Sequence, residues 1–416
     1  MPKIKIKNFG PIKQGNKDSD GWIDIKKVSI FIGNQGSGKS CIAKLVSTFM
    51  WIEKVLVRGD YAITDFSADK FRRIYCGYHR IENYFFNKHH EDIAEIEYEG
   101  DAYHMKYNKG IFKITEHIVE QYHLPQIMYV PTERNFISII KEAKSFKSLP
   151  DSLLEYLTEF NNAKSEINEE IALPINGTHI LYDKQRDIIN ISGHDYKVKL
   201  TEASSGFQSL VPLFLVSWYL ANTVKRQIEN PQKMSPNESK RFNDGVKSIW
   251  ADISLTDEQR RIALSALSSQ FNKSAFINIV EEPELNLYPD SQRGMIYNLL
   301  ELNNLSVNNK LIITTHSPYI INELSLVVKA EQVQQFILNS GRKDEINRLN
   351  QIIPVKSLIS EQEWVVYEID NQGTIYKLND YHGLPSDDNY LNVFLAKTGS
   401  IFSQLLELED EYARQL

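Results

Sequence analysis

The first residues that could do chemistry read GNQGSGKS and occupy positions 33–40, directly after the apolar run VSIFI. In a strand–loop–helix setting, this glycine-rich pattern lets backbone N–H groups and a helix N-terminus face a phosphate. Lys39 would reach the β- and γ-phosphates, and the Ser40 hydroxyl would be a ligand of Mg²⁺. A chance loop is the alternative. The nucleotide contacts expected here are Gly33, Asn34, Gln35, Gly36, Ser37, Gly38, Lys39, Ser40 and Cys41.

Two adjacent carboxylates follow a second apolar run in FINIVEEPELNLYP. A strand that ends in Glu281 and Glu282 places both at the carboxyl edge of a parallel sheet, where α/β proteins bind ligands. Glu281 would support Mg²⁺ through water, and Glu282 would polarise the attacking water as a general base. The alternative is a solvated Glu-Glu-Pro turn after a core strand. Asn278 inside the run has no functional explanation from the sequence.

A histidine follows a third apolar run in LIITTHSPYIINEL. His316 lies 34 residues after Glu282, which leaves room for one helix and one strand in a parallel crossover. From the same sheet edge it could contact a γ-phosphate. A purely structural histidine is the alternative.

A fourth segment, TEASSGFQSL, has small residues where a long helix should begin. Such a start could bind a second phosphate, or it could be an ordinary Ser/Gly cap of a core helix. The candidate contacts are Ser204, Ser205, Gly206 and Gln208.

These segments need strands and helices to position them. Apolar periodicity predicts strands in the first 33 residues, a helix after Lys39, a helix over 151–170 capped by Asp151, and a largely helical stretch over about 210–271. Further strands are expected as a meander over 93–115, at 126–131, as a hairpin over 177–193, at 275–280 and 310–315, and as a hairpin over 364–378. A helix with acidic residues closes the chain, either as an ordinary amphipathic end or as a docking helix for a basic partner.

The composition is that of an ordinary soluble protein, with 42% hydrophobic and 24% charged residues. No apolar run approaches the roughly 20 residues that span a bilayer, so no membrane association is expected. Two cysteines fit no metal spacing, and a cytoplasmic location is the expectation. The net charge of −7 gives no support to broad DNA binding, although a local cluster such as KEAKSFK at 141–147 leaves DNA open.

Together and in this order, the four segments resemble the ATP-binding-cassette (ABC) class of ATPase heads found in RecF, SMC and OLD-type proteins. The resemblance makes GNQGSGKS the Walker A motif, SSGFQS the signature, FINIVEE the Walker B motif, PELNLYP the D-loop and His316 the switch histidine. The signature departs from the LSGGQ form of transporters, and Glu281 stands where many relatives have Asp. The Q-loop glutamine stays open, with Gln126 as the nearest candidate.

The resemblance implies an α/β fold: a P-loop ABC-type head with a mixed sheet and an antiparallel β lobe, a helical lobe and a small α+β C-terminal region. Residues 1–50, 124–136 and 196–335 would form the head, with its helical lobe at about 210–271. Residues 51–123 and 137–195 would form an inserted β/α lobe, and 336–416 a region for assembly or docking.

In such heads the signature of one chain packs on the ATP held by another. The resemblance therefore implies ATP and Mg²⁺ as ligands, and catalytic roles for Glu282, His316 and Lys39. It also implies a homodimer with ATP between two heads, extended to a higher even-numbered homo-oligomer, in which Ser205, Gly206 and Gln208 act in trans.

The C-terminal region bears on the output of such a switch. OLD-type nucleases carry a Toprim domain there, but residues 336–416 offer only PSDDNY and scattered acids. This layout is similar to the stand-alone ATPases of the anti-phage systems PARIS and, next, Septu. It implies a separate effector, a Toprim-type nuclease, and a phage-encoded trigger. A RecF-like DNA repair ATPase and a scaffold with a decayed site are the alternatives.

Overall fold

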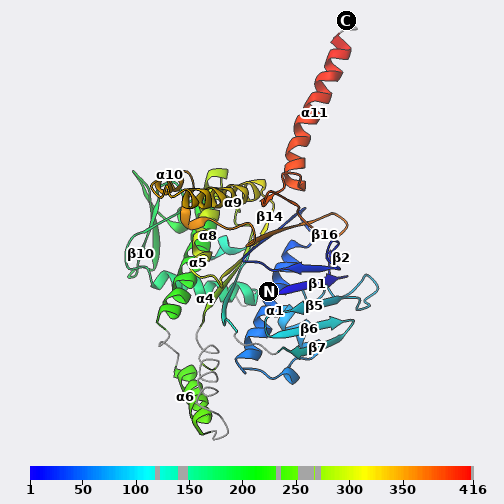
Figure 1. Cartoon of the computed structure of the whole chain (residues 1–416), viewed down its shortest axis with the longest axis vertical. Coiled ribbons are helices and arrows are strands. Elements are labelled where there is room, and N and C mark those ends of the chain that lie inside the picture. Colours follow the sequence, from blue (N-terminus) through cyan, green and yellow to red (C-terminus); the bar gives the residue numbers. More distant parts are fainter. Residues whose placement is uncertain (118–121, 139–148, 231–235, 252–266, 268–272, 414–416) are drawn as a thin grey trace.

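Figure 1 shows the computed structural model of the 416-residue chain, which describes residues 1–117, 122–138, 149–230, 236–251, 267 and 273–413. The basic cluster at 141–147 and most of 252–272 lie outside these residues.

The central sheet has seven strands in the order β2-β16-β15-β4-β14-β13-β8. The five strands from β15 to β8 run parallel, and β16 turns back antiparallel to β15. Because the first three chemical segments end β4 or follow β13 and β14, they meet at one carboxyl edge. The strands are β2 (Gln14–Asn16), β16 (Thr374–Lys377), β15 (Trp364–Ile369), β4 (Val28–Gly33), β14 (Lys310–Thr315), β13 (Ala275–Glu281) and β8 (Pro125–Val130).

A second, antiparallel sheet covers one face of the molecule in the order β3-β1-β5-β6-β7. Helix α1 (Lys39–Val57) packs between the two sheets, and its apolar side chains share one core cluster with both. Strand β4 shows the period of two: Ile30 and Ile32 face the opposite cluster, whereas Phe31 faces α1. The strands are β3 (Trp22–Asp24), β1 (Lys3–Lys7), β5 (Glu95–Glu99), β6 (Tyr103–Asn108) and β7 (Ile111–Glu116).

The other face of the central sheet is covered by helices (Figure 1). They are α4 (Asp151–Ser165), α5 (Ser205–Glu229), α8 (Pro289–Asn303) and α9 (Pro318–Asn339). Asn278 is explained here, because its side-chain amide donates to the Ser217 hydroxyl of α5 at 2.9 Å in this core. Within the described residues, α5 is long and apolar enough to cross a membrane, but 67% of its apolar window is buried inside the protein.

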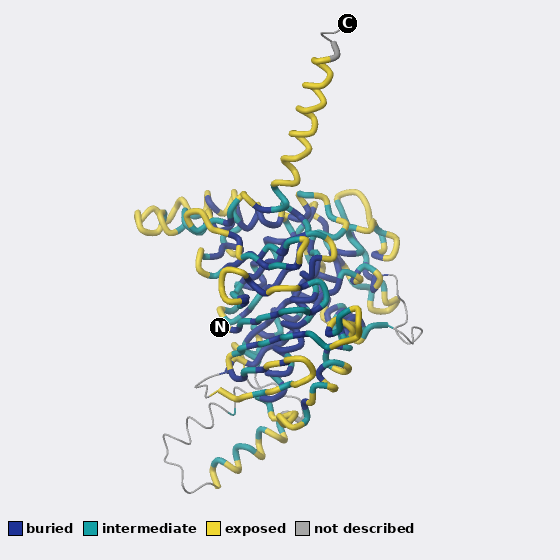
Figure 2. The backbone as a smooth tube through the Cα atoms, turned by 90° about the vertical axis from the view of Figure 1, so that its right-hand side faces the viewer, coloured by how far each residue is buried: buried dark blue, intermediate teal, exposed yellow. Residues whose placement is uncertain are grey.

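Smaller elements surround this body. A four-stranded antiparallel sheet lies beside the helices, and α11 (Tyr390–Ala413) projects from the body as an exposed rod (Figure 2). The smaller elements are α2 (Ala68–Lys70), α3 (Arg134–Ile137), β9 (Ile171–Ala172), β10 (His179–Asp183), β11 (Ile188–Ser192), β12 (Lys197–Lys199), α6 (Pro236–Ala251), α10 (Glu345–Ile352), β17 (Asp380–Tyr381) and β18 (Leu384–Pro385), with single helical turns at Ile63–Asp65, Phe71–Cys76, Gly77–His79, Leu200–Glu202 and Val355–Ser357.

The fold is the predicted mixed α/β P-loop head of the ABC type. Its lobes are connected differently from the sequence-based division, however. Strand β5 of the meander pairs with β1, so the meander extends a sheet begun by the N-terminus. The C-terminal hairpin β15–β16 joins the central sheet beside β4 instead of forming a separate region. Asp151 is the first residue of α4, and Pro150 takes the cap position.

Candidate functional site

The phosphate loop joins β4 to α1 through glycines that no other residue could replace. Gly33 and Gly38 have φ of 147° and 113°. A Cβ on Gly33 would lie 2.4 Å from the Ile369 carbonyl oxygen, and one on Gly38 would lie 2.7 Å from Ile12 Cγ1. The Ser37 hydroxyl is buried without a hydrogen-bond partner among the described residues. A tight glycine turn with an unpaired hydroxyl fits a loop that wraps an anion.

Lys39 lies at the centre of the site and is only 4% exposed. Its ammonium donates to the carbonyls of Gly33 and Asn34, both at 2.8 Å, and its Nζ lies 3.4 Å from His316 Nδ1. Burial lowers its pKa to about 8, while the charge of Glu282 acts in the opposite direction. The loop thus holds a buried cation at the place where the motif predicts phosphate.

Glu282 and His316 come together as the spacing of the two segments predicts. Glu282 Oε1 lies 3.2 Å from His316 Nε2. The hydrogen bond to His316 lowers the pKa of Glu282, so its carboxylate is held ionised. Glu282 has a left-handed backbone with φ of 45°. Lys39, His316 and Glu282 therefore form one continuous polar chain at the carboxyl edge of the sheet.

Glu284 supports this chain, and sequence reasoning gave it no role. Its Oε1 accepts from the Thr315 hydroxyl and from the His316 backbone N–H, both at 2.7 Å. Burial raises the pKa of this carboxyl group. Glu284 thereby fixes the turn that carries the histidine. Its place two residues after Glu282 in the D-loop segment was the available signal.

Glu281 ends β13 and is 4% exposed, with Oε1 buried and unpaired within the described residues. A buried carboxylate oxygen without a partner suits the water-mediated role toward Mg²⁺ predicted for it. Ser40, in the first turn of α1, is half-buried. The residues present therefore fit the metal.

Cys41 is buried, and burial raises its thiol pKa to about 12, so it contributes packing and a backbone N–H to the loop region.

Arg134 is the other residue that the sequence did not reveal. Its side chain is fully buried and donates to four backbone carbonyls, those of Pro131, Ser209, Glu281 and Glu282. These carbonyls lie at the ends of β8 and β13 and in α5. The guanidinium thus ties the end of the Walker B strand to the signature helix. Only its place just after a buried strand, in VPTERNF, hinted at a role.

The signature residues lie at the start of α5 and face outward. Ser204 and Ser205 are exposed. A Cβ on Gly206 would lie 2.9 Å from the Asn286 carbonyl oxygen, and Asn286 donates to the Ser209 hydroxyl, so the D-loop packs against this helix. The Gln208 side chain donates to the carbonyls of Thr201 and Ala203 in its own loop.

Two further contacts complete the surroundings. Gln126, the candidate Q-loop residue, pairs with Phe276 near the amino end of β13. It therefore lies at the opposite end of the strand from Glu281, and the geometry does not bring it to the site. The Asn34 amide of the phosphate loop donates to Asn371 in the C-terminal hairpin at 2.8 Å, a contact that the sequence did not suggest.

Comparison with known proteins supports an ATPase domain. The sequence model of the AAA ATPase domain matches residues 253–321, which include Glu281, Glu282 and His316. The lipoprotein-releasing system ATP-binding protein LolD of Buchnera aphidicola subsp. Acyrthosiphon pisum is 31% identical over 110 residues. This match takes in 26% of the chain, and the chain spans 46% of LolD.

Two solved structures are similar in outline. The Smc head domain from Pyrococcus furiosus, bound to the C-terminal domain of ScpA, has 11% identity and a TM-score of 0.36, covering 97% of this chain and 100% of that one. The dimeric bacterial ABC transporter cassette MJ0796 has 11% identity and a TM-score of 0.24, covering 92% and 100%. The fold assignment rests on strand order and on the phosphate loop, not on these likenesses.

Proposed function

We propose that this ABC-type ATPase is a nucleotide-driven switch in which ATP joins two copies of the chain and hydrolysis loosens them. The observation that carries the proposal is the division of the site. Lys39, Glu282 and His316 form one half, while Ser204 and Ser205 face solvent at the start of α5. A second copy can complete each half.

The residues divide the work of hydrolysis among them. Lys39 and the backbone N–H groups of the loop bind the phosphates of ATP. Ser40 and Glu281 would hold Mg²⁺, which supplies charge neutralisation at the phosphates. Glu282, ionised through its contact with His316, orients a water molecule and takes its proton. His316 lies between Glu282 and Lys39, so a contact between His316 and the γ-phosphate would affect the positions of both side chains.

ATP acts in this scheme as a ligand of an interface. To move such a pair from mostly open to mostly closed, nucleotide must favour the closed form by about 5.5 kcal/mol. Two charge-rich sites per pair are a plausible source of this free energy. Slow turnover suits the role, because the lifetime of the pair is set by hydrolysis.

The biological output that we propose is anti-phage defence. The resemblance to the ATPases of PARIS and Septu supports a chain that holds or releases a separate nuclease effector after a phage-encoded trigger appears. Co-expression of the Glu282→Gln chain with its genomic neighbours, followed by native mass spectrometry with ATP, tests this role. Co-purification of a neighbouring protein in an even-numbered assembly is expected. A bare dimer that retains duplex DNA would instead favour a RecF-like repair ATPase.

The composite site has its own test, which pairs two inactive variants. Lys39→Ala removes nucleotide binding, and Ser205→Arg blocks the exposed signature without disturbing the core. A mixed pair contains one site with an intact phosphate loop facing an intact signature. We therefore expect each variant alone to be inactive and their mixture to regain a part of the ATPase activity. A mixture as inactive as its components would reject the two-chain site.

A further inference from the structure

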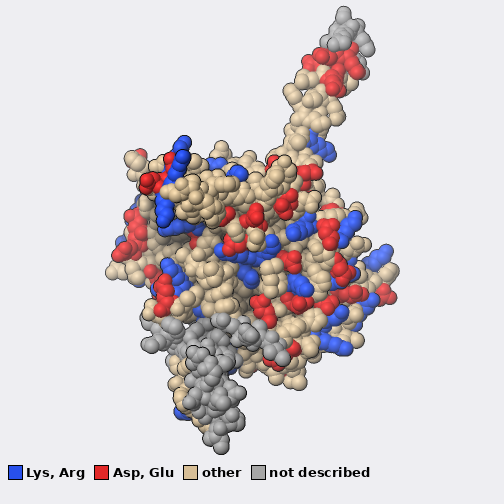
Figure 3. All heavy atoms as spheres, viewed as in Figure 1, with Lys and Arg blue, Asp and Glu red and all other residues tan. Residues whose placement is uncertain are grey.

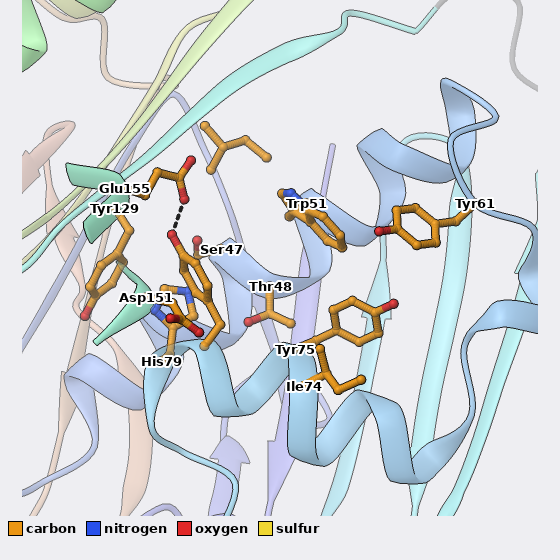
Figure 4. A pocket seen from close by; sticks show the side chains of 12 residues that line it. Ser47, Thr48, Trp51, Tyr61, Ile74, Tyr75, His79, Tyr129, Asp151 and Glu155 are labelled. Atoms are coloured by element: carbon orange, nitrogen blue, oxygen red, sulfur yellow. Dashed lines mark hydrogen bonds between the residues drawn. The ribbon is translucent and has the colours of Figure 1, made fainter. Parts of the chain in front are cut away.

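A cavity of about 280 Å³ lies beside the middle of α1, where Ser47, Thr48 and Trp51 line it (Figure 4). It opens between α1, the turns at Phe71–Cys76 and Gly77–His79, β8 and α4. Nothing in the proposed ATPase mechanism uses it. The lining residues on which the argument depends are Trp51, Tyr61, Tyr75, His79, Tyr129 and Glu155.

One polar group in the wall of this cavity is buried and unpaired. His79 is 3% exposed, and its Nδ1 has no hydrogen-bond partner within the described residues. The hydroxyl of Tyr129 points away from the cavity, toward Glu281. Burial lowers the pKa of His79 to about 3, so its ring is neutral and keeps one nitrogen as an acceptor. Buried polar atoms of this kind normally have a partner, which indicates a ligand or water in the cavity.

The wall favours a ligand that is positive and rich in donors. Trp51 contacts Tyr61 and Tyr75 with ring centroids 6.0 and 5.4 Å apart, so aromatic rings form one end. The carboxylates of Asp151 and Glu155 lie at the other end, where Glu155 accepts a hydrogen bond from the Tyr78 hydroxyl. No lysine or arginine is among the described lining residues, and the charge of Lys54 acts on Glu155 from outside the lining. Aromatic faces and carboxylates together are the chemistry that binds organic cations.

We propose that this cavity binds a small organic cation, with a guanidinium or alkylammonium head near Glu155 and its body against Trp51, Tyr61 and Tyr75. Titration calorimetry with agmatine and with spermidine tests this on the full chain without nucleotide. Agmatine is expected to bind, and Glu155→Gln and Tyr61→Leu should each weaken binding by about fivefold to tenfold. Both side chains are exposed enough that substitution leaves the fold intact.

Glu159→Gln, one turn further along α4 and outside the cavity, is the matched control and should leave binding unchanged. The proposal fails if neither amine binds, or if Glu155→Gln and Glu159→Gln bind equally well. Binding of the neutral probe adenosine in place of the amines would also overturn it. The experiment needs no ATP, so its result is independent of the proposed switch.

A different observation concerns α11, which packs on the body through Leu391 but leaves its later apolar side chains exposed in the described part of the chain. From Val393 to Glu411 every residue is exposed. One stripe consists of Leu391, Phe394, Thr398, Ile401, Leu405 and Leu408, which is apolar except at Thr398 and follows the alternating spacing of three and four of a coiled coil. Further exposed apolar residues outside this stripe are Val393, Leu395, Phe402 and Leu406. Phe394, Ile401, Leu405 and Leu408 are 48 to 59% exposed. A stripe with this spacing is built to pack on another helix.

The charged residues of α11 indicate which partner helix fits it and in which direction the two helices run. Glu407, Glu409, Asp410 and Glu411 form an acidic end of α11 (Figure 3), and Lys397 is the basic residue of the described helix, nearer the body. A parallel pair would place acid against acid. In an antiparallel pair of two copies, Lys397 lies on the same side of the contact as Glu411 of the second copy. The same register packs Ile401 on Leu405 and Thr398 on Leu408, so the apolar stripe and the charges agree.

We propose that α11 pairs antiparallel with α11 of a second copy, in a contact separate from the nucleotide site. Because the helix projects from the body, this arrangement keeps the two bodies at opposite ends of the pair (Figure 1). Sedimentation of the full-length Lys39→Ala chain without ATP should show a dimer. Adding Ile401→Glu and Leu405→Glu should produce a monomer, whereas Ser403→Glu on the opposite helix face should leave the dimer.

Direction is tested by disulfide formation. A chain carrying Lys397→Cys, mixed with one carrying Glu411→Cys, should form the mixed disulfide; the native Cys41 and Cys76 are buried. Disulfides only between identical positions would overturn the antiparallel direction. A monomeric Lys39→Ala chain, or a dimer that survives the Ile401 and Leu405 changes, would overturn the contact itself.

Discussion

Glu282, the proposed general base, has a backbone conformation that a glutamate rarely adopts. Its φ of 45° turns the side chain away from the line of β13 and toward His316, at 3.2 Å. Such conformations persist where the surroundings hold them, and they gather at functional sites. Here Arg134 donates to the Glu282 carbonyl, and the Glu282 N–H donates to the Thr314 carbonyl at 2.8 Å. The geometry of the base is therefore imposed by its neighbours.

Replacing the base should separate binding from hydrolysis. We expect Glu282→Gln to lower kcat by about 10²- to 10³-fold, because the amide cannot take a proton from water. ATP binding should remain, since Lys39 and the loop are untouched. Phosphate release and equilibrium nucleotide binding measured on the same preparation check both parts. Hydrolysis at the parent rate would assign the base to another residue.

We expect Arg134 to position the backbone around Glu281 and Glu282 and to take no direct part in hydrolysis. An ammonium cannot span four carbonyls as the guanidinium does, so Arg134→Lys leaves buried carbonyls unpaired and should cost about 2–4 kcal/mol of stability. We expect a lower melting temperature and a reduced kcat with the pH profile unchanged. Arg186→Lys, at an exposed arginine, is the control. Parent-like stability and activity in Arg134→Lys would remove its assigned role.

Residues that belong to recognisable motifs could be predicted from the sequence. Residues that hold those motifs in place could not. Lys39, Glu281, Glu282 and His316 could be found because their spacing implies strand, loop and helix. Arg134 and Glu284 could not, since a buried arginine bound to carbonyls and a buried acid look the same in a sequence as exposed ones. Their roles depend on which strand ends become neighbours.

At the scale of elements, α1 links the phosphate loop to the antiparallel sheet through a buried acid. Glu53 accepts from the backbone N–H groups of Ala102 and Tyr103, at 2.6 and 3.0 Å, and from the Tyr98 hydroxyl at 3.2 Å. A Cβ on Gly100 would meet this carboxylate at 2.2 Å, so the turn needs glycine there. The strand meander is thus fixed to the helix that begins with Lys39.

This acid makes stability depend on pH. Burial raises the pKa of Glu53 from 4.5 to about 7, so between these values the folded chain holds a proton that the unfolded chain has lost. Stability should therefore fall as pH rises from about 4.5 to 7, by roughly 1–3 kcal/mol, and level off above. Melting temperatures at pH 5, 6 and 8 measure the slope, which Glu53→Gln should flatten. Glu99→Gln, at a half-buried carboxylate paired with Lys3, should keep the slope. An unchanged slope in Glu53→Gln would contradict the assignment.

Individual strands could be predicted well, but their neighbours in the sheets could not. The runs VSIFIG, FINIVE and KLIITT are strands as expected, because apolar runs of this length and composition are typical of buried strands. The hairpin at 364–377 was also expected, yet its place beside β4 depends on pairing across more than 300 residues. Periodicity is local and carries no information on such pairings.

For the whole molecule, the ATP-dependent pair should bury the face that carries the signature and the D-loop. Tyr288 lies in the D-loop segment and is 77% exposed. If this face closes, Tyr288→Ala should weaken the pair by roughly fivefold to thirtyfold, the usual cost of truncating an aromatic at an interface. Sedimentation of the Glu282→Gln chain with ATP checks this. Tyr381→Ala, at a residue 72% exposed in β17, is the matched control, and equal effects would place the contact elsewhere.

The position of the C-terminal hairpin also has a consequence for folding during translation. The phosphate loop follows β4, which lies between β14 and β15, and Asn34 is bonded to Asn371. The ribosome makes the loop long before the strands that flank it, which end at residues 315 and 369. A nascent chain therefore carries the phosphate loop without its neighbouring strands until β15 has been made. We expect nucleotide binding, and with it pairing, to be deferred until then.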